Sequence, residues 1–530
     1  MDIGTISLVL LISLLVLLAI GMPLGFASGI LAVAVLVMKF GPDFLFNEFG
    51  RGPLNILVQR MYGLTTDYVI ISVPLFIFMA TLLERSGIAR DMYNSLSVWL
   101  NRTRGGIALV TSVMAVVMAA MSGIIGGEVV LLGLIALPQM LRLGYDQNLA
   151  IGTICASGSL GTMIPPSIVL IMYGLITETS IHALFQAAFV PGFLLAILYM
   201  IYIIVRTRMN PSLAPLPERG PDDMDGRTKA IYGSALIALL AVVALGLLIC
   251  RALFLDHFDR ISEEHSMVGT GFITKAGIAL ALLLAYLVFY TKPKRVKAAW
   301  DVGKGMVAPL VVVFVVLGSI YGGVTGITEA AGMGTVAVLI LIILRREFSW
   351  RLVYEALMRT FKSTGTIIWV TLGATALAGA YTIVGGPTYV ANLIIGADLP
   401  TLGVLLMMMA IFLFLGAFMD WVGIVLLVMP VFLPIVAKLP VEELGLFGPL
   451  ADARSFVPVW FGILFCVNMQ VSFLSPPFGP AAFYLKSVAP PHITLPAIFR
   501  GFLPFIMIQL VVLAIVLFFP EITMLFAPTR

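Results

Sequence analysis

Residues 157–167 read SGSLGTMIPPS and place glycines, hydroxyls and two adjacent prolines inside a long apolar region. Proline has no backbone N–H and interrupts helices, and unpaired backbone groups are costly in lipid. The stretch therefore predicts a break in a membrane helix, which frees carbonyls for other partners. The alternative is a proline kink that neighbouring helices satisfy.

The composition places this break in a membrane protein. Of 530 residues, 61% are hydrophobic and 11% are charged, and the mean hydropathy is +1.10. Apolar runs of membrane-spanning length recur along the chain, for example at 3–20, 231–250 and 501–519. We therefore predict a polytopic α-helical membrane protein in which 3–20 is the first transmembrane helix, since no basic region precedes it. Buried, inert thiols are expected at Cys155, Cys250 and Cys466.

The distribution of basic residues predicts the orientation of the chain. Segments 251–267 and 385–400 contain few or no lysines and arginines, so we expect them outside the cell. The connection 39–67 carries balanced charges and is also expected outside, together with the N-terminus. Four other segments are rich in basic residues and are expected in the cytoplasm: 85–105, 206–229, 291–305 and 345–362.

The two halves of the chain share one order of features. Each half has a helix, a glycine turn, a helix, a Gly/Pro-interrupted segment and a Pro-Pro break. Because the polar connection before the first unit is expected outside and its counterpart inside, the repeats are inverted. Paired interrupted segments in inverted halves indicate a transporter binding site near the membrane midplane. The first-half stretches are 73–96, 121–140 and 157–167, and their counterparts are 371–394, 415–434 and 471–481.

Several stretches resemble the large membrane subunit of the tripartite ATP-independent periplasmic (TRAP) transporters. They include GYDQNLAIGTICASGSLGTMIPPSIVLIMYGLITETSIHALFQAAFVPGFL (144–194), GSIYGGVTGITEAAG (318–332) and FLGAFMDWVGIVLLVMPVFLPIV (414–436). VPVWFGILFCVNMQVSFLSPPFGPAAF (457–483) and GMPLGFASG (21–29) are collinear with the same family.

The resemblance implies an all-α polytopic fold, an inverted-repeat elevator-type transporter with two re-entrant helical hairpins. An extra transmembrane hairpin is inserted between the halves, with apolar segments at 231–250 and 276–290. The expected parts are a first repeat at 1–206, the insert at 207–300 and a second repeat at 301–530. The expected hairpins lie near 119–140 and 415–436, and the broken helices near 147–175 and 457–485.

Site residues are implied by the same family pattern. The first Na⁺ site would use Ser122, Gly161, Ile164 and Pro166, and the second would use Gly416, Ser472, Ser475 and Phe478. The substrate candidates are Ser157, Ser159, Thr162, Asn468 and Asp420. Each serine has an alternative role, in which its hydroxyl bonds back to a carbonyl of its own helix.

The first hairpin departs from the family pattern. Its tip usually reads Ser-Gly-Ser, but here it is Ser122-Gly123-Ile124, so one hydroxyl is missing. Glu128 stands where the family is usually small and polar, and the residues alone give it no role. Ser472 stands where glycine is more common. Two further carboxylates, Glu329 and Asp420, also lie at membrane depth, and Glu329 is also suited to capping a helix N-terminus.

The expected function is Na⁺-coupled import of a small organic acid without ATP, in the bacterial inner membrane. The resemblance implies two partners, a small four-helix membrane subunit and a periplasmic binding protein. A dicarboxylate, keto acid, sugar acid, polyol or aromatic acid remains open as substrate. One alternative is a stand-alone Na⁺/dicarboxylate symporter. An intramembrane enzyme is a weaker one, because no HExxH, paired-carboxylate or phosphate-loop motif is present.

Overall fold

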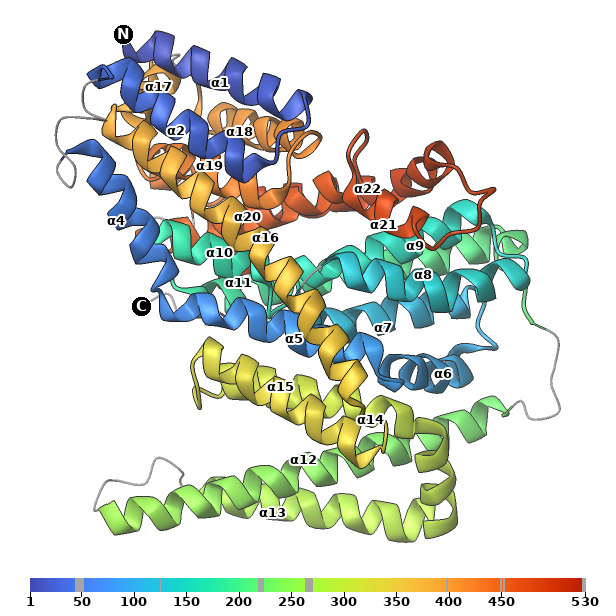
Figure 1. Cartoon of the computed structure of the whole chain (residues 1–530). Coiled ribbons are helices and arrows are strands. Elements are labelled where there is room, and N and C mark those ends of the chain that lie inside the picture. The colour runs from blue at the N-terminus through green and yellow to red at the C-terminus, as the bar shows by residue number, and fades with distance from the viewer. Residues whose placement is uncertain are drawn as a thin grey trace.

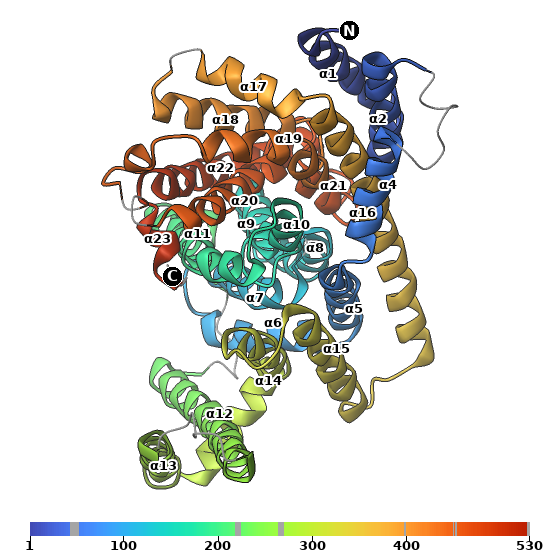
Figure 2. The ribbon, with the colours of Figure 1, turned by 90° about the vertical axis from the view of Figure 1, so that its left-hand side faces the viewer.

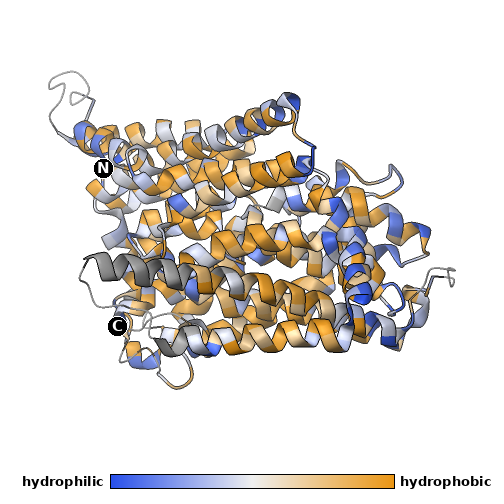
Figure 3. Cartoon of the chain, turned by 90° about the horizontal axis from the view of Figure 1, so that it is seen from below, coloured by the Kyte–Doolittle hydropathy of each residue, from blue (hydrophilic) through white to orange (hydrophobic). Residues whose placement is uncertain are grey.

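The computed structural model describes residues 1–42, 52–123, 125–217, 224–262, 270–396, 399–448, 450 and 453–526. These residues form helices joined by turns, and no strand occurs among them. Nine of the helices in this part of the chain are long and apolar enough to cross a membrane. Figure 3 shows apolar residues along the middles of the helices and polar residues gathered near their ends. The predicted all-α polytopic fold is confirmed.

The chain begins with two helices that form an antiparallel pair. The Asp2 side chain accepts a hydrogen bond from the Gly4 amide and so caps the first helix. Gly21, in the left-handed region at φ 84°, lies in the turn before the second helix. The helices in this part are α1 (Ile3–Ala19), α2 (Leu24–Phe40) and α4 (Pro53–Thr65).

The first half continues with a helical hairpin, α7 and α8, and a broken helix, α9 and α10. A short 3₁₀ turn at Leu160–Thr162 ends the first part of the broken helix, and the Pro165-Pro166 bond after it is cis. The Ser167 hydroxyl then caps the second part by accepting from the Leu170 amide at 3.4 Å. The helices are α5 (Ser72–Arg85), α6 (Ile88–Leu100), α7 (Gly106–Ser122), α8 (Ile125–Arg142), α9 (Gln147–Ser159), α10 (Ile168–Thr177) and α11 (Ile181–Met209).

The second half repeats this order, with a hairpin formed by α18 and α19 and a broken helix formed by α20 and α21. Its Pro476-Pro477 bond is also cis. The helices are α14 (Pro293–Tyr321), α15 (Ile327–Leu344), α16 (Trp350–Ile383), α17 (Gly386–Ile395), α18 (Thr401–Gly416), α19 (Trp421–Val436), α20 (Val457–Leu474), α21 (Pro480–Lys486), α22 (Leu495–Phe518) and α23 (Glu521–Met524).

The two broken helices lie at the centre of the molecule (Figure 2). In the span that contains α20, 94% of the residues of its most apolar window are buried. Large side chains such as Trp460, Phe461 and Phe465 fill the space around it. The apolar core therefore packs around the same elements that carry the Pro-Pro breaks.

The insert forms a long helical pair that stands apart from this core. Its helices are α12 (Gly226–Ser262) and α13 (Thr270–Ala285), which lie side by side (Figures 1 and 2). Helix α12 also contacts α14, which joins the pair to the rest of the molecule. In the most apolar stretch of each of the two spans of the insert, only 18% and 17% of the residues are buried. Cys250 is exposed on α12, so the expectation that all three thiols are buried is wrong for this residue. Its helix has few neighbours in the chain to cover it.

Two of the basic segments meet in space. An ion pair joins Arg345 to Asp91, another joins Arg85 to Glu355, and Arg359 donates to Glu84 at 2.8 Å. Segments 85–105 and 345–362 therefore lie on the same side, in agreement with their common predicted location in the cytoplasm. Of the acidic stretch 251–267, residues 263–267 lie outside the described residues.

The connections before the two repeat units lie at opposite ends of one helix. Segment 345–362 covers the beginning of α16, whereas Leu57 and Arg60 of α4 pack against Gly379 near its end. Helix α16 crosses the molecule diagonally between them (Figure 1). This arrangement agrees with the predicted inversion. Of the connection 39–67, residues 43–51 lie outside the described residues.

Candidate cation and substrate site

The tip of the first hairpin packs directly against the first Pro-Pro break. Helix α7 ends at Ser122, and Gly123 follows with φ 65°. The Gly123 carbonyl accepts a hydrogen bond from the Ile168 amide at 3.4 Å. A β-carbon on Gly123 would lie 2.6 Å from the Pro166 carbonyl oxygen, so both the backbone angle and the space require glycine.

Three residues from three different elements meet beside this contact. The Ser122 hydroxyl donates a hydrogen bond to the Glu128 carboxylate, which comes from the first turn of α8. A β-carbon on Gly161 would lie 2.8 Å from Glu128 Oε1. Glu128 is 1% exposed. The hairpin tip, the start of α8 and the broken helix therefore surround one buried carboxylate.

The structure thus brings together three of the four residues predicted for the first Na⁺ site. Ser122 and Gly161 border Glu128, and Pro166 borders the hairpin tip. Ile164 is buried in the same turn, where its amide donates to the Leu160 carbonyl at 2.9 Å. The oxygens available here are a hydroxyl, a carboxylate and backbone carbonyls, the ligand types that suit a hard cation.

The second hairpin makes the corresponding contact with the second broken helix. Gly416 ends α18, and a β-carbon on it would overlap the Ser472 side chain. Ser472 donates to the Asn468 carbonyl at 3.3 Å. Ser475 ends α20 and donates to the Val471 carbonyl at 2.8 Å, while the Phe478 ring is 41% exposed. Of the second predicted set, the hairpin residue Gly416 and the broken-helix residue Ser472 are in close contact, because the Ser472 side chain lies where a β-carbon of Gly416 would be.

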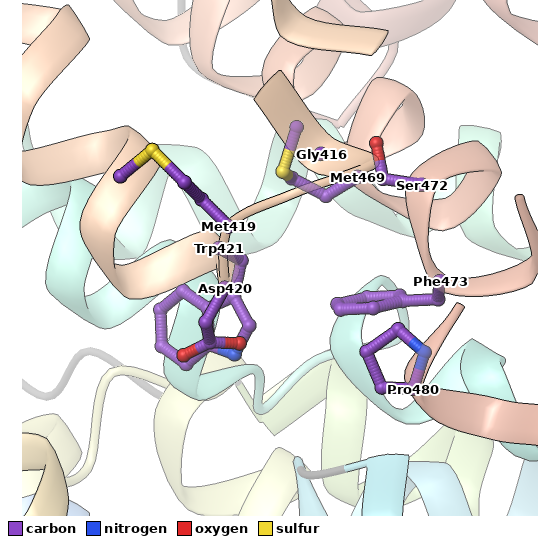
Figure 4. Close-up of a pocket in the computed structure, with 8 residues that line it drawn as sticks. All are labelled: Gly416, Met419, Asp420, Trp421, Met469, Ser472, Phe473 and Pro480. Atoms are coloured by element: carbon purple, nitrogen blue, oxygen red, sulfur yellow. The ribbon is translucent and has the colours of Figure 1, made fainter. Parts of the chain in front are cut away.

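A small pocket opens at this contact. Gly416 and Ser472 lie at one end of it. Asp420 and Trp421 stand on one side, facing Phe473 and Pro480 on the other (Figure 4). Met419 and Met469 complete the lining. Asp420 is exposed and immediately precedes α19, so its carboxylate is accessible.

The predicted substrate residues do not line one common cavity. Ser157 is bonded to Ser112 at 2.9 Å, and Ser159 donates to the Ala156 carbonyl at 2.8 Å. Asn468 donates to the Met409 carbonyl at 3.1 Å. These side chains and Thr162 are buried, and only Asp420 faces the pocket.

Gln470 links the two broken helices and was not singled out from the sequence. Its amide nitrogen donates to the Ser159 carbonyl at 2.9 Å and to the Thr162 hydroxyl at 2.7 Å. Its amide oxygen is buried without a hydrogen-bond partner. The signal that could have identified Gln470 is its polar side chain in an otherwise apolar helix, close in sequence to Asn468 and Ser472.

An ion pair between α5 and α16 lies against the first hairpin and was also missed. Glu84 accepts from Arg359, and their side chains are 10% and 40% exposed. The Glu84 carboxylate sits where a β-carbon of Gly127 would be. On the neighbouring residue, a β-carbon of Gly126 would lie 3.1 Å from the Tyr484 ring. Two glycines therefore let outside side chains approach the backbone just before Glu128.

Glu329 lies in the first turn of α15, but the capping role weighed from the sequence is wrong. Gly326 is the capping residue, and the Glu329 carboxylate instead accepts from the Tyr68 hydroxyl at 2.9 Å. Within the described ranges, no three His, Cys, Asp or Glu side chains come together.

Apolar helices of spanning length and broken helices that face hairpin tips define a multi-pass membrane protein of the transporter class. Residues 11–522 match the family described as "Tripartite ATP-independent periplasmic transporter, DctM component". The chain belongs to this family, as the sequence motifs predicted. Its members are transporters, so the enzyme alternative is excluded, and the chain is a multi-pass protein of the inner membrane.

Characterised relatives match almost the whole chain. The C4-dicarboxylate TRAP transporter large permease of Pseudomonas aeruginosa is 25% identical and covers 93% of this chain and 92% of its own. The sialic acid large permease of Vibrio cholerae is 23% identical, with 95% and 94% covered. The ectoine/5-hydroxyectoine large permease of Ruegeria pomeroyi is 25% identical, with 91% and 90% covered.

Proposed function

We propose that this large permease subunit imports a small organic acid by Na⁺ coupling, without ATP. A periplasmic binding protein delivers the substrate, and a small four-helix membrane subunit completes the complex. The family assignment supports both partners. It also disfavours the stand-alone symporter.

The observation that carries Na⁺ coupling is the pairing of hairpin tips with broken helices in both halves. Gly123 meets Pro166 in the first half, and Gly416 meets Ser472 in the second. Broken helices present free carbonyls, and the half-helix ends carry partial charges. A hard cation bound there links a hairpin tip to a broken helix. Cation binding therefore shapes the site that the substrate then occupies.

An elevator movement of the hairpins and broken helices fits the packing. These elements form the centre, while α5, α14, α15 and α16 lie along one side of it (Figures 1 and 2). Helix α5 contacts α7 and α8 of the first hairpin, and helix α16 contacts α19 of the second hairpin. In this proposal α5 and α16 belong to the static part, and substrate binds between the two hairpins beside Asp420.

The substrate class follows from the relatives. The three permeases described above transport, by their names, C4-dicarboxylates, sialic acid and ectoines. All of these molecules carry a carboxylate. A small organic acid is therefore the proposed substrate class.

The experiment is transport by the reconstituted complex. The permease, its small subunit and the binding protein loaded with substrate are reconstituted in liposomes. Uptake should require an inward Na⁺ gradient and remain unchanged when ATP is added. Full uptake driven by a proton gradient in Na⁺-free buffer would contradict the proposal.

A further inference from the structure

We propose that Glu128 is a direct, negatively charged ligand of the cation at the first site. This inference rests on the Na⁺ coupling proposed above and adds to it a residue outside the predicted ligand set. It also gives the first site a buried charge, which the described residues of the second site lack.

The geometry places the Glu128 carboxylate at the meeting point of the predicted ligands. It accepts from the Ser122 hydroxyl, and both of its oxygens lie near Gly161, at 3.0 Å or less from the position of a β-carbon there. The hairpin tip on the other side of Ser122 contacts the Pro166 carbonyl through Gly123. A cation that binds to Ser122 at this tip therefore lies within reach of Glu128.

One oxygen of this carboxylate has no partner. Glu128 Oε2 is buried and makes no hydrogen bond, although the side chain is 1% exposed. A buried carboxylate oxygen without a donor is expensive in an apolar environment. A cation beside Oε2 supplies the missing partner and neutralises the charge. The orphaned oxygen is therefore the observation that favours a ligand role over a packing role.

Neighbouring cations do not fill this role. Glu84 is an acidic residue near Glu128, and its own partner is Arg359 at 2.8 Å. Arg359 is thereby engaged by Glu84. Among the described ion pairs, none includes Glu128. No basic side chain among the described residues pairs with Glu128, so a bound cation would supply the compensating charge.

Glycines make this arrangement possible. At Gly161 a β-carbon would press on the carboxylate, and at Gly127 it would occupy the position of Glu84. The absent second serine of the hairpin tip removes one hydroxyl ligand, and Glu128 enters from the first turn of α8. The carboxylate therefore replaces a neutral ligand by a charged one.

The second half has no buried equivalent. Its hairpin carboxylate, Asp420, is exposed and faces the pocket beside Gly416 and Ser472. The two sites should therefore differ in affinity, because a charged ligand binds a cation more strongly than a hydroxyl or a carbonyl. The first site should be the tighter one.

The test is direct Na⁺ binding to the purified permease, measured with ²²Na⁺ in a scintillation proximity assay. E128Q keeps the size of the side chain and a group that can bond to Ser122, but removes the charge. The Na⁺ affinity of the tighter site should fall by about tenfold or more. E128D keeps the charge and should retain more of the affinity. The control is E329Q, because Glu329 is an exposed carboxylate that accepts a hydrogen bond from Tyr68. This variant should leave Na⁺ binding unchanged.

The outcomes separate the two proposals. If the wild-type protein binds no Na⁺, both the coupling proposal and this inference fail. If the wild type binds Na⁺ and E128Q binds it equally well, only this inference fails. Should E128Q not fold, as judged by gel filtration and thermal melting, E128D decides. A loss of Na⁺ affinity that is smaller in E128D than in E128A then supports the charged ligand, and equal losses in the two variants overturn it.

Discussion

Gly416 and Ser472 approach each other so closely that a β-carbon on the glycine would overlap the serine side chain. This contact joins the end of the second hairpin's first helix to the second broken helix. The Ser472 hydroxyl and β-carbon are the two nearest atoms, so the space is limited by this one side chain. While position 472 is a serine, the hairpin and the broken helix can therefore pack in this way only if position 416 is a glycine.

Gly416→Ala should abolish or strongly reduce uptake, because the new methyl group forces the hairpin away from the broken helix. Overpacking of this kind usually costs about 1–3 kcal/mol. The second substitution Ser472→Gly removes both crowding atoms and should restore part of the activity. Ser472→Ala retains the β-carbon and should not. Equal uptake by Gly416→Ala alone, by its combination with Ser472→Gly and by its combination with Ser472→Ala would show that the contact does not limit packing.

Ser122→Ala should weaken Na⁺ binding without unfolding the protein. A hydrogen bond to a charged group is worth about 1.5–3 kcal/mol, and 1.4 kcal/mol is about a factor of ten. The half-saturating Na⁺ concentration should therefore rise by about tenfold or more. The control is Ser13→Ala in α1, far from the breaks, which should have no effect. The dependence of uptake on Na⁺ concentration provides the measurement.

Ser475→Ala tests the second site in the same assay. Its hydroxyl bonds back to the Val471 carbonyl in the present structure, which is the alternative role weighed from the sequence. If it also coordinates Na⁺, the variant should raise the half-saturating concentration and make the Na⁺ dependence less steep. An unchanged curve, with normal expression, would assign Ser475 to the helix alone.

Gln470→Leu should destabilise the protein by about 1–3 kcal/mol, because the Ser159 carbonyl and the Thr162 hydroxyl lose their buried donor. The melting temperature of the purified permease measures this change. Gln509→Leu is a useful comparison, since both amide atoms of Gln509 are buried without a partner. Its loss should cost less. A larger loss in Gln509→Leu would show that the bridge between the broken helices contributes little.

Arg359→Met should destabilise the protein more than the double variant with Glu84→Gln. The single change leaves a nearly buried carboxylate without its cation, whereas the double change removes the charge as well. The coupling energy from the double-mutant cycle should be about 0.5–3 kcal/mol. Chemical or thermal unfolding of the four proteins provides it. Additive effects would mean that the pair contributes no net interaction.

A cysteine at Ser262, the last residue of α12, should react with a membrane-impermeant thiol reagent in intact cells. The background should carry Cys250→Ser, because Cys250 is exposed, whereas Cys155 and Cys466 are buried. Labelling only after permeabilisation would place the end of α12 in the cytoplasm and reverse the predicted orientation of the insert.

The fold was largely predictable because its signals are local. Apolar runs mark the helices, and the pairs Pro165-Pro166 and Pro476-Pro477 mark the breaks. Ser122, Gly161 and Pro166, which the family pattern groups together, do lie around the tip of the first hairpin. These features depend on short stretches of sequence.

The remaining site features depend on contacts between distant segments, which no short pattern contains. Glu84 ends a helix beside Arg85 and reads as an ordinary surface acid, but the fold buries it against Gly127. Its partner Arg359 lies 275 positions away. Similarly, the exposure of Cys250 follows from how few helices surround α12, which the apolar sequence does not reveal.

Helix α16 is a single rod of 34 residues, about 51 Å long, whereas the hydrocarbon layer is about 30 Å thick. It must therefore lean strongly or extend beyond the layer. Gly373 is pressed against the Gly25 carbonyl, and the Trp369 ring packs at a tilt against Phe26 with ring centres 5.1 Å apart. Helix α16 is thereby held against α2. It also binds Glu84 of α5 through Arg359 and contacts α19 of the second hairpin, so a single helix ties the two halves of the molecule together.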